Sequence, residues 1–261
     1  MHDLKNKSLY IFDMDGTIYL GSRVFPFAVD FIRALRAAGK RVLFFTNNAS
    51  KSPDVYMERL TRMGFAPSRE ELMTSGDVTI RFLQNHRPGK SVYLVGTPDL
   101  CRQFAQEGIT LREDAEVVVT SFDTTLTYEK LNIACRLVRG GAEYLSTHPD
   151  FNCPTEDGFI PDSGAIAAFV TASTGVSPVY FGKPYAQTIE MIAEHTGTAR
   201  EDMCIFGDRL YTDIALGKRH GVTAVLVLSG ETQPADLENV KPEDYPDFVF
   251  PSLAEVSAEL L

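Results

Sequence analysis

The sequence predicts an α/β protein with a parallel-sheet core and an inserted second α/β unit. Short apolar runs, rich in Val, Ile and Phe, alternate with segments of helical periodicity, which is typical of parallel β-α-β units. Such runs occur in the first, middle and last parts of the chain, and the middle part repeats the pattern as a unit of its own. We therefore expect a core at residues 1–75 and 181–261, and an inserted α/β domain at residues 76–180.

The first part of the chain predicts a strand at 8–12, a helix, and a second strand at 40–45. Gly39 is expected to end that helix, and Pro53 occupies a first-turn position of the next one. One face of the first helix is marked by four apolar residues with the appropriate spacing: Ala28, Phe31, Ile32 and Leu35.

The last part of the chain predicts two buried strands, at 203–208 and 223–228, and an edge strand at 247–250. The inserted unit is expected to alternate strands with helices. Its strands are predicted at 91–96, 116–121 and 142–147, and its helices at 98–106, 128–138 and 164–174.

Composition narrows the functional classes. The chain has 261 residues, of which 44% are hydrophobic and 23% charged, as in ordinary globular proteins. Its net charge of -10 argues against a general nucleic-acid or anionic-membrane surface, so a phosphate site must supply its own local positive charge. No apolar run approaches the roughly 18 residues that span a bilayer.

The cysteines indicate a reducing compartment. None of them forms a C-x-x-C pair or lies near histidines with zinc-site spacing. The N-terminal residues lack the apolar core of a signal peptide, so we expect a cytoplasmic protein. The residues expected to be reduced core thiols are Cys101, Cys135, Cys153 and Cys204.

Polar side chains follow the core strands, at the edge of the sheet where parallel α/β proteins bind ligands. Asp13 and Asp15 stand one residue apart after the first strand, and such crowded carboxylates are costly unless a cation balances them. Taken singly, the residues of this set also suit ordinary roles: Thr46 could cap a helix, Lys183 could be a surface lysine, and Asp208 could be a turn residue. The others in this set are Thr46, Asn47, Asn48, Lys183, Asp208 and Asp213.

Together these residues supply what phosphoryl transfer from a monoester requires. Asp13 is the expected nucleophile, because a carboxylate can take the phosphoryl group covalently and divide one difficult step into two. We expect Mg²⁺ between Asp13 and the anionic phosphate, since this ion prefers oxygen ligands. The predicted ligands are the carboxylates of Asp13 and Asp208 and the backbone carbonyl of Asp15, with Asp213 holding metal-bound waters.

The remaining residues suit the phosphate and the leaving group. Lys183 is expected to balance the charge of Asp13 and of the phosphate oxygens. Asp15 is expected to protonate the leaving oxygen and later to take a proton from the attacking water. The predicted phosphate-binding residues are Thr46, Asn47, Asn48 and Lys183.

The motifs resemble those of the haloacid dehalogenase superfamily of phosphatases. The stretches "DMDGT", "FFTNNAS", "GKP" and "GDRLYTDI" resemble its four motifs in order, and their form is closer still to the NagD-like, or 4-nitrophenylphosphatase, branch. The resemblance implies a Rossmann-like core and a mobile cap inserted between the second and third motifs, which matches the unit predicted at 76–180. It is compatible with a monomer or with a homodimer through the cap.

The predicted cap departs from the family pattern at residues 147–150, which read "THPD" where the family often has T-N-P-D. We expect His148 and Asp150 to contact the leaving group, with Arg209 meeting them from the core, because such side chains suit sugar hydroxyls. Capping of a backbone group is the alternative role of His148. Phe151 is the one nearby ring, and we expect it to pack rather than to stack on a base.

The predicted substrates are therefore small phosphorylated metabolites, most of all sugar phosphates, together with 4-nitrophenyl phosphate. Nucleotide 5′-monophosphates are the alternative within the same mechanism. A phospho-accepting signalling domain is a remote alternative, because Asp15 and the inserted unit would have no role in it. A dinucleotide-dependent dehydrogenase is excluded, since no G-x-G-x-x-G follows any predicted strand.

Overall fold

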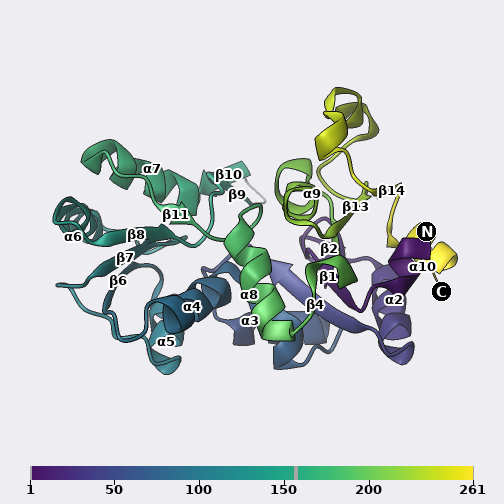
Figure 1. Ribbon diagram of the computed structural model, residues 1–261, viewed down its shortest axis with the longest axis horizontal. Coiled ribbons are helices and arrows are strands. Elements are labelled where there is room, and N and C mark those ends of the chain that lie inside the picture. Colours follow the sequence, from purple (N-terminus) through teal and green to yellow (C-terminus); the bar gives the residue numbers. More distant parts are fainter. Residues whose placement is uncertain (1, 156–157, 261) are drawn as a thin grey trace. The chain divides into compact units, whose positions relative to one another are not determined.

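The computed structural model describes residues 2–155 and 158–260, which divide into two compact units (Figure 1). Unit 1 comprises the described residues of Met1–Thr46, Tyr56–Met73 and Lys183–Leu261. Unit 2 comprises those of Asn47–Val55 and Thr74–Gly182, so the loop after the second core strand groups with it. The bounds at 76 and 180 and the role of the inserted stretch as a cap stay predictions.

Unit 1 is built on a sheet of six strands among the described residues, and the strands at 9–12, 41–46, 203–207, 223–227 and 248–250 pair in parallel. The predicted strands are confirmed, and the strand near the C-terminus lies at an edge of the sheet, as expected. The order across the sheet is β14 (Phe248–Phe250), β13 (Thr223–Val227), β12 (Met203–Gly207), β1 (Leu9–Phe12), β4 (Arg41–Thr46) and β5 (Leu72–Thr74).

An aromatic core lies under the strands whose ends hold the polar motifs. The rings of Phe12 and Phe206 stack with their centroids 4.9 Å apart, and Phe31 meets Phe12 edge-on at 6.0 Å. All three side chains are fully buried, and Phe44 packs beside Phe12. Since such rings are large and adopt few rotamers, they fix the relative positions of β1, β4 and β12.

Helices complete unit 1, and both described ends of the chain lie close together in it (Figure 1). The predicted helix face on α2 is confirmed, because its four apolar residues are buried. The helices are α1 (His2–Asn6), α2 (Pro26–Ala37), most of α3 (Pro53–Arg62), α8 (Ala186–Thr196), α9 (Ala215–His220) and α10 (Leu253–Leu260). Shorter helical turns are η1 (Arg69–Glu71), η2 (Arg200–Asp202), η3 (Leu210–Ile214), η4 (Pro234–Asn239) and η5 (Pro242–Asp244).

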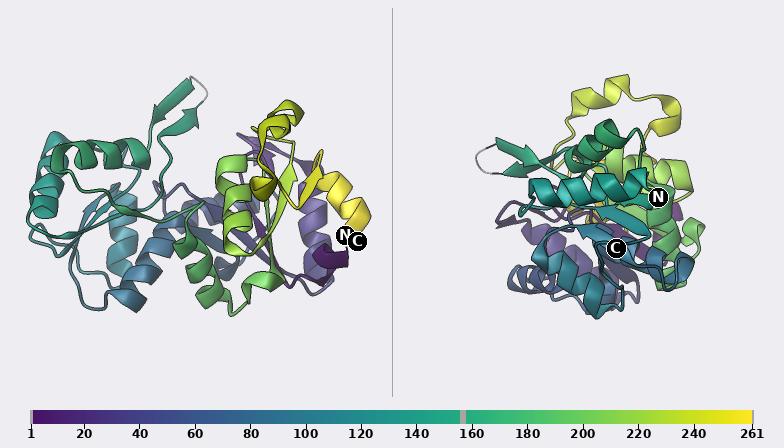
Figure 2. Two further views of the ribbon diagram at one scale, coloured as in Figure 1. Left: turned by 45° about the horizontal axis from the view of Figure 1, so that its top comes forward. Right: turned by 90° about the vertical axis from the view of Figure 1, so that its left-hand side faces the viewer.

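Unit 2 has its own parallel sheet, with two helices on each face (Figures 1 and 2). The order of strands is β11 (Val179–Tyr180), β8 (Glu143–Ser146), β7 (Val117–Thr120) and β6 (Val92–Val95). One face is covered by α6 (Tyr128–Arg139) and α7 (Ser163–Thr174), and the other by α4 (Ser75–His86) and α5 (Pro98–Gln106). Two antiparallel strands, β9 (Asn152–Thr155) and β10 (Gly158–Pro161), form a separate ribbon.

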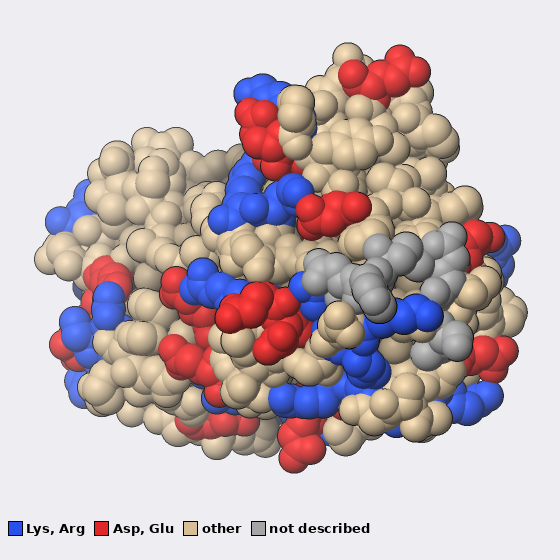
Figure 3. All heavy atoms as spheres, turned by 45° about the vertical axis from the view of Figure 1, so that its right-hand side comes forward, with Lys and Arg blue, Asp and Glu red and all other residues tan. Residues whose placement is uncertain are grey.

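The cysteines differ in burial, and the surface mixes charges of both signs on the face drawn in Figure 3. Figure 3 shows basic and acidic side chains interspersed over the face that it draws. Cys135 and Cys204 are buried as expected, whereas Cys101 and Cys153 are only half-buried. Among the described residues, no helix has the length and apolar character needed to cross a bilayer.

Candidate active site

Unit 1 brings four predicted site residues together at the carboxyl ends of its strands. Asp13 follows β1, Asp208 follows β12, and Asp213 lies in η3, the helical turn after β12. Each of the three carboxylates offers an oxygen, and these atoms all lie within 4.8 Å of one another. Lys183, which precedes α8, joins them, so the sequence-predicted convergence is found in the structure.

Lys183 is the cation of this cluster. Its side chain is 3% exposed, and its Nζ donates to Asp13 Oδ1 and pairs with Asp213 Oδ1 at 2.7 Å. Burial alone would lower the pKa of Lys183, but the adjacent carboxylates of Asp13 and Asp213 outweigh it and hold that pKa above its usual value. Lys183 is therefore a permanent positive charge beside Asp13.

Asp208 lies in a cradle made of backbone. The N–H of Glu231 donates to Asp208 Oδ2 at 2.7 Å, and Gly16 and Gly230 face the same carboxylate. A Cβ at Gly16 would lie 2.3 Å from Oδ2, and one at Gly230 would lie 2.0 Å away, so only glycine fits at either place. Gly16 also has a φ of 92°, which favours glycine independently.

The three carboxylates carry more negative charge than Lys183 balances. Burial raises the pKa of the Asp13 carboxyl to about 8, Lys183 opposes this shift, and the charges of Asp213 and Asp208 reinforce it. Burial likewise raises the pKa of Asp208 to about 6, with the charge of Asp213 adding to the effect. A further cation would favour the ionised forms of both groups.

The residues present fit a divalent metal. Asp208 Oδ1 is buried, and it has no hydrogen-bond partner within the part of the chain that the structure describes. Buried carboxylate oxygens without partners are costly, and oxygen atoms are the ligands that Mg²⁺ prefers. Asp213 differs, because its oxygens are bonded to Lys183 and to the Arg209 N–H, the latter at 3.2 Å. Its side chain is therefore already engaged in holding Lys183 and the turn.

Asp15 is exposed and is held by a small hairpin. Strands β2 (Tyr19–Leu20) and β3 (Arg23–Val24) pair antiparallel, and the Gly21 N–H at their turn donates to Asp15 Oδ1 at 3.1 Å. The carboxylate of Asp15 thus stands outside the carboxylate cluster, two residues from Asp13 in sequence but in a more exposed environment. That separation suits two carboxylates with different tasks.

The second motif follows β4, which ends at Thr46. Asn48 Oδ1 accepts hydrogen bonds from the Ser50 N–H at 2.9 Å and from Ser50 Oγ at 2.7 Å, which fixes the turn of this loop. Asn47 is buried, and its Nδ2 donates to Asp150 Oδ2 at 3.0 Å within unit 2. The structure thus gives Asn48 a role in shaping the loop, and the predicted phosphate contacts stay predictions.

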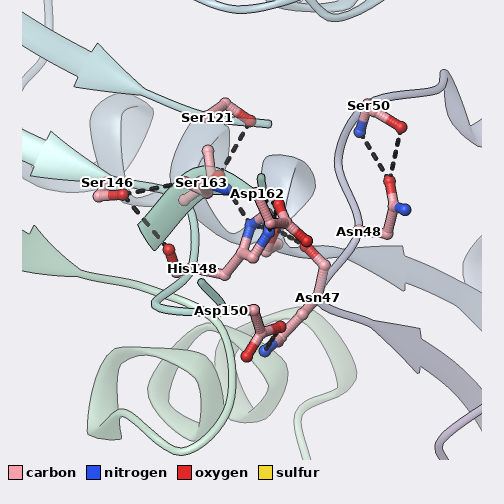
Figure 4. Close-up of polar contacts among 11 residues, drawn as sticks. Asn47, Asn48, Ser50, Ser121, Ser146, His148, Asp150, Asp162 and Ser163 are labelled. Carbon is pink, nitrogen blue, oxygen red and sulfur yellow. Dashed lines mark hydrogen bonds and ion pairs between the residues drawn. The ribbon is translucent and has the colours of Figure 1, made fainter. Parts of the chain in front are cut away.

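His148 lies in a buried polar network of unit 2 (Figure 4). Its Nε2 donates to Asp162 Oδ1 at 2.8 Å, and its Nδ1 lies 3.0 Å from Thr147 Oγ1 and 3.3 Å from Ser75 Oγ. The side chain is 0% exposed and both ring nitrogens have partners. This geometry favours a positioning role for His148, and its contact with substrate hydroxyls stays a prediction.

Arg209 is half-buried beside the carboxylate cluster of unit 1. Its Nε pairs with Glu231 Oε2 at 2.9 Å, and the Tyr211 hydroxyl donates to the other oxygen of Glu231 at 2.9 Å. Burial would lower the pKa of Arg209, but the negative charges around it raise it further above its usual value. Its predicted meeting with His148 and Asp150 stays a prediction, because those residues belong to unit 2.

The loop after β13 contains functional residues that the sequence analysis missed. Ser229 Oγ donates to the Gly16 carbonyl at 2.7 Å, Gly230 packs on Asp208, and Glu231 supplies both a backbone donor and the partner of Arg209. The sequence did contain one indication: this loop follows the predicted strand at 223–228, and ligands bind beyond the carboxyl ends of parallel strands. Asp162, the partner of His148 in unit 2, was missed as well.

Comparison with known families agrees with this geometry. Residues 10–110 match the model of the haloacid dehalogenase-like hydrolases, and residues 180–256 match a second model of the same hydrolase family. The matched segments contain the D-x-D-G-T, T-N-N, G-K-P and G-D-R motifs.

Similar proteins cover nearly the whole chain. The acid sugar phosphatase of Staphylococcus saprophyticus is 35% identical over 259 residues, covering 98% of this chain and 99% of that protein. The 4-nitrophenylphosphatase of Thermotoga maritima is 41% identical, with a TM-score of 0.94 and full coverage of both chains. The p-nitrophenyl phosphatase of Archaeoglobus fulgidus is 30% identical, with a TM-score of 0.91 over 98% of this chain and 100% of that one. The chain belongs to the haloacid dehalogenase-like hydrolases and groups with their phosphatase members.

Proposed function

We propose that this protein is a magnesium-dependent phosphatase that hydrolyses small phosphate monoesters, sugar phosphates above all, through a phosphoryl group carried on Asp13. The proposal rests on one observation: a partly buried carboxylate, Asp13, is paired with a buried lysine and stands beside Asp208, whose Oδ1 lacks a partner among the described residues. A purely structural ion pair would have no need of that additional buried charge. The similarity to sugar phosphatases and 4-nitrophenylphosphatases supports the same substrate class.

In the first half-reaction a carboxylate oxygen of Asp13 attacks phosphorus, and the bond from phosphorus to the leaving oxygen breaks. Lys183 offsets the negative charge that Asp13 and the phosphate share. Asp15, in its acid form, gives its proton to the leaving oxygen, which departs as an alcohol. The products are the alcohol and a phosphoryl group bound to Asp13.

In the second half-reaction water attacks the phosphorus of the acyl phosphate. Asp15, now a carboxylate, takes the proton from this water, and the bond between phosphorus and the Asp13 oxygen breaks. Inorganic phosphate is released, and Asp13 and Asp15 return to their starting forms. Thr46 and Asn47, at the end of β4 and just beyond it, are the proposed donors to the phosphate oxygens.

Mg²⁺, held by carboxylate oxygens of Asp13 and Asp208 and by the Asp15 carbonyl, would supply positive charge that offsets the repulsion between Asp13 and the phosphate. The protein's own contribution is to keep that charge in place. Glu231 fixes Asp208 through its backbone N–H, and Asp213 fixes Lys183.

The test is a substrate panel assayed with the purified protein. It comprises hexose and pentose phosphates, nucleoside 5′-monophosphates and 4-nitrophenyl phosphate, each measured with Mg²⁺, with Ca²⁺ and with a chelator. We expect a sugar phosphate to have the highest kcat/KM, a chelator to abolish turnover, and Mg²⁺ to restore it. Ca²⁺ should not restore it, because its larger and looser coordination sphere would displace Asp13 from the phosphate.

Each outcome of the panel decides a different part of the proposal. Absence of turnover on every monoester would refute the phosphatase function. Preference for nucleoside monophosphates would keep the mechanism and replace the substrate class. Full activity with the chelator or with Ca²⁺ would refute the proposed metal site.

A further inference from the structure

Asp150 and Asn47 are joined by a hydrogen bond that the proposed mechanism does not use. Asn47 Nδ2 donates to Asp150 Oδ2 at 3.0 Å, and Asn47 is only 7% exposed (Figure 4). An ionised carboxylate can only accept hydrogen bonds, so it selects the one amide orientation in which Nδ2 faces it. Asp150 therefore determines which way the Asn47 amide points.

The opposite side of the Asn47 amide is closely packed. A Cβ on Gly182 would lie 2.8 Å from Asn47 Oδ1 and 2.8 Å from His148 Cβ, so the backbone of Gly182 fills this space and no side chain fits there. The backbone of Asn47 is held as well, because Ser75 Oγ donates to its carbonyl. The residue is thus fixed through its side chain and through its main chain.

Asp150 is itself held in place by the start of α7. Its carbonyl accepts from the Gly164 N–H at 2.8 Å, and a Cβ on Gly164 would lie 2.1 Å from the Pro149 carbonyl oxygen. Only glycine permits this approach of the loop to the helix. The loop cannot shift toward α7 without a clash of backbone atoms, so the backbone of Asp150, from which its carboxylate extends, has a defined position.

His148 ties the same loop to two helix starts. Its Nε2 bonds to Asp162, the residue that precedes α7, and its Nδ1 lies near Ser75, the first residue of α4. Ser75 in turn bonds to the Asn47 carbonyl. The buried histidine therefore supports the segment that presents Asp150, and it reaches the Asn47 backbone through one hydroxyl.

From this arrangement we infer that Asp150 is a positioning residue for phosphate binding, acting through the Asn47 amide. The inference rests on the proposed function, in which Asn47 donates to the phosphate. It assigns to the loop Thr147–Asp150 a task that is independent of the leaving group. If instead Asp150 contacted a sugar hydroxyl directly, its loss would harm sugar phosphates alone.

The test compares variants on two substrates and includes a double-mutant cycle. Asp150→Ala removes the acceptor, and Asp150→Asn keeps an acceptor oxygen while losing the charge. For each variant, kcat/KM is measured on a sugar phosphate and on 4-nitrophenyl phosphate, together with the inhibition constant of inorganic phosphate. Both variants are also made in an Asn47→Ala background, and circular dichroism and thermal unfolding check that each protein folds.

A matched control is available in the same unit. Glu143, at the start of β8, is a half-buried carboxylate that pairs with Arg87 at 2.6 Å within unit 2. Glu143→Ala removes a paired, half-buried carboxylate at the start of β8, whereas Asp150 lies in the loop that follows β8. It should leave both kcat/KM values and the phosphate inhibition constant unchanged.

Asp150→Ala should lower kcat/KM by the same factor on both substrates, roughly ten- to a hundredfold, as expected for a hydrogen bond to a charged group. Inhibition by phosphate should weaken in parallel, and Asp150→Asn should lose less activity than Asp150→Ala. In the Asn47→Ala background, neither Asp150 substitution should change kcat/KM or the phosphate inhibition constant. If Asp150→Ala does not fold, the double-mutant cycle of Asp150→Asn with Asn47→Ala still tests whether the two substitutions have less than additive effects.

Other outcomes overturn the inference. A loss confined to the sugar phosphate would assign Asp150 to the substrate hydroxyls. Additive effects with Asn47→Ala, or no effect of either Asp150 variant, would show that Asp150 does not act through Asn47. The wild-type protein is assayed on both substrates as well. If it turns both over, the phosphatase function holds, and a negative result with the variants refutes the role of Asp150 alone.

Discussion

The two units place polar side chains at comparable positions, beyond the carboxyl ends of parallel strands, yet they use them differently. In unit 1 the ends of β1 and β12 carry charged groups, and Asp208 Oδ1 has no partner among the described residues. In unit 2 the ends of β7 and β8 carry mostly hydroxyls and a histidine, and these groups bond to one another. The same topology thus supports one set of groups that are incompletely paired and another that is mutually bonded.

The difference shows how to recognise each kind of cluster. Buried groups that lack partners cost stability, so a fold retains them where a ligand completes their bonding. A network whose donors and acceptors are all matched gives rigidity and local order instead. We therefore expect substitutions in the carboxylate cluster to change chemistry more than stability, and substitutions in the hydroxyl network to do the reverse.

The largest effect is expected for Asp13→Asn. An amide cannot act as the nucleophile, so kcat should fall by at least about a thousandfold on every substrate. In the metal-free protein the unfolding temperature should be kept or raised, because one of three clustered carboxylates is neutralised while Asp213 still pairs with Lys183. Steady-state kinetics and thermal unfolding measure the two quantities, and a variant with near-normal kcat would exclude Asp13 as the nucleophile.

The next effect distinguishes Asp208 from Asp213. Asp208→Asn should raise the Mg²⁺ concentration needed for half-maximal activity by more than about a hundredfold, and Asp213→Asn by about tenfold. Asp213→Asn should also lower the unfolding temperature, because the fully buried Asp213 carboxylate accepts from the Arg209 N–H and the Thr212 hydroxyl as well as pairing with Lys183. Magnesium titrations of both variants test this order. Equal shifts in the Mg²⁺ requirement would contradict the assignment of direct metal ligation to Asp208 and of metal-bound waters to Asp213.

A smaller effect, and one on stability, is expected for Thr147→Val in unit 2. The substitution keeps the shape but removes a hydroxyl that donates to Ser121 Oγ at 2.9 Å and lies 3.0 Å from His148 Nδ1. The free energy of unfolding should fall by about 1–2 kcal/mol. The ratio of kcat/KM between a sugar phosphate and 4-nitrophenyl phosphate should not change.

Denaturant titration measures the change for Thr147→Val, and Thr110→Val, at an exposed position, is its control. Unchanged stability in both variants would show that the hydroxyl network does not stabilise unit 2. A change in the substrate ratio would show that this network contributes to substrate selection.

The smallest effect is expected for Arg59→Gln, on α3. Arg59 donates to the Gly21 carbonyl and lies over the Tyr19 ring, 4.4 Å from its centroid, so it holds the hairpin whose Gly21 N–H bonds to Asp15. Its loss should lower kcat roughly three- to tenfold for an alkyl phosphate, and less for 4-nitrophenyl phosphate, whose leaving group needs little protonation. The two rates are measured side by side.

Arg62→Gln is the control for this variant, since Arg62 lies on the same helix and forms an exposed pair with Glu58 at 3.9 Å. It should leave both rates unchanged. Equal losses on the two substrates in Arg59→Gln would mean that Arg59 does not act through Asp15.

Much of unit 1 could be predicted because its central strands are continuous apolar runs and its site residues are recognisable by their side chains. The strands near residues 9–12 and 203–207 are buried apolar runs, and the convergence of Asp13 with Asp208 follows from the parallel arrangement of their strands. The edge strand β5 was not predicted, since Leu72–Thr74 is only three residues long and shows no periodicity.

What the sequence could not show is which polar groups are already bonded. Glu231 holds Asp208 through a backbone N–H, a donor that every residue except proline carries, so its side chain gave no signal. His148 lies in a polar loop sequence that suggests exposure, yet the loop is folded under α7 and its ring is buried. Such burial depends on tertiary packing, which local patterns do not contain.

The most direct test of the central claim is to look for the phosphoryl group on Asp13. Wild-type protein and the Asp15→Asn variant, in which slow hydrolysis should let the intermediate accumulate, are quenched in acid during turnover of 4-nitrophenyl phosphate and digested. Mass spectrometry of the peptides should find one added phosphoryl group on the peptide with Asp13, at higher occupancy in the Asp15→Asn variant and absent from Asp13→Asn. A phosphoryl group on another residue, or none in either turning-over protein, would contradict covalent catalysis by Asp13.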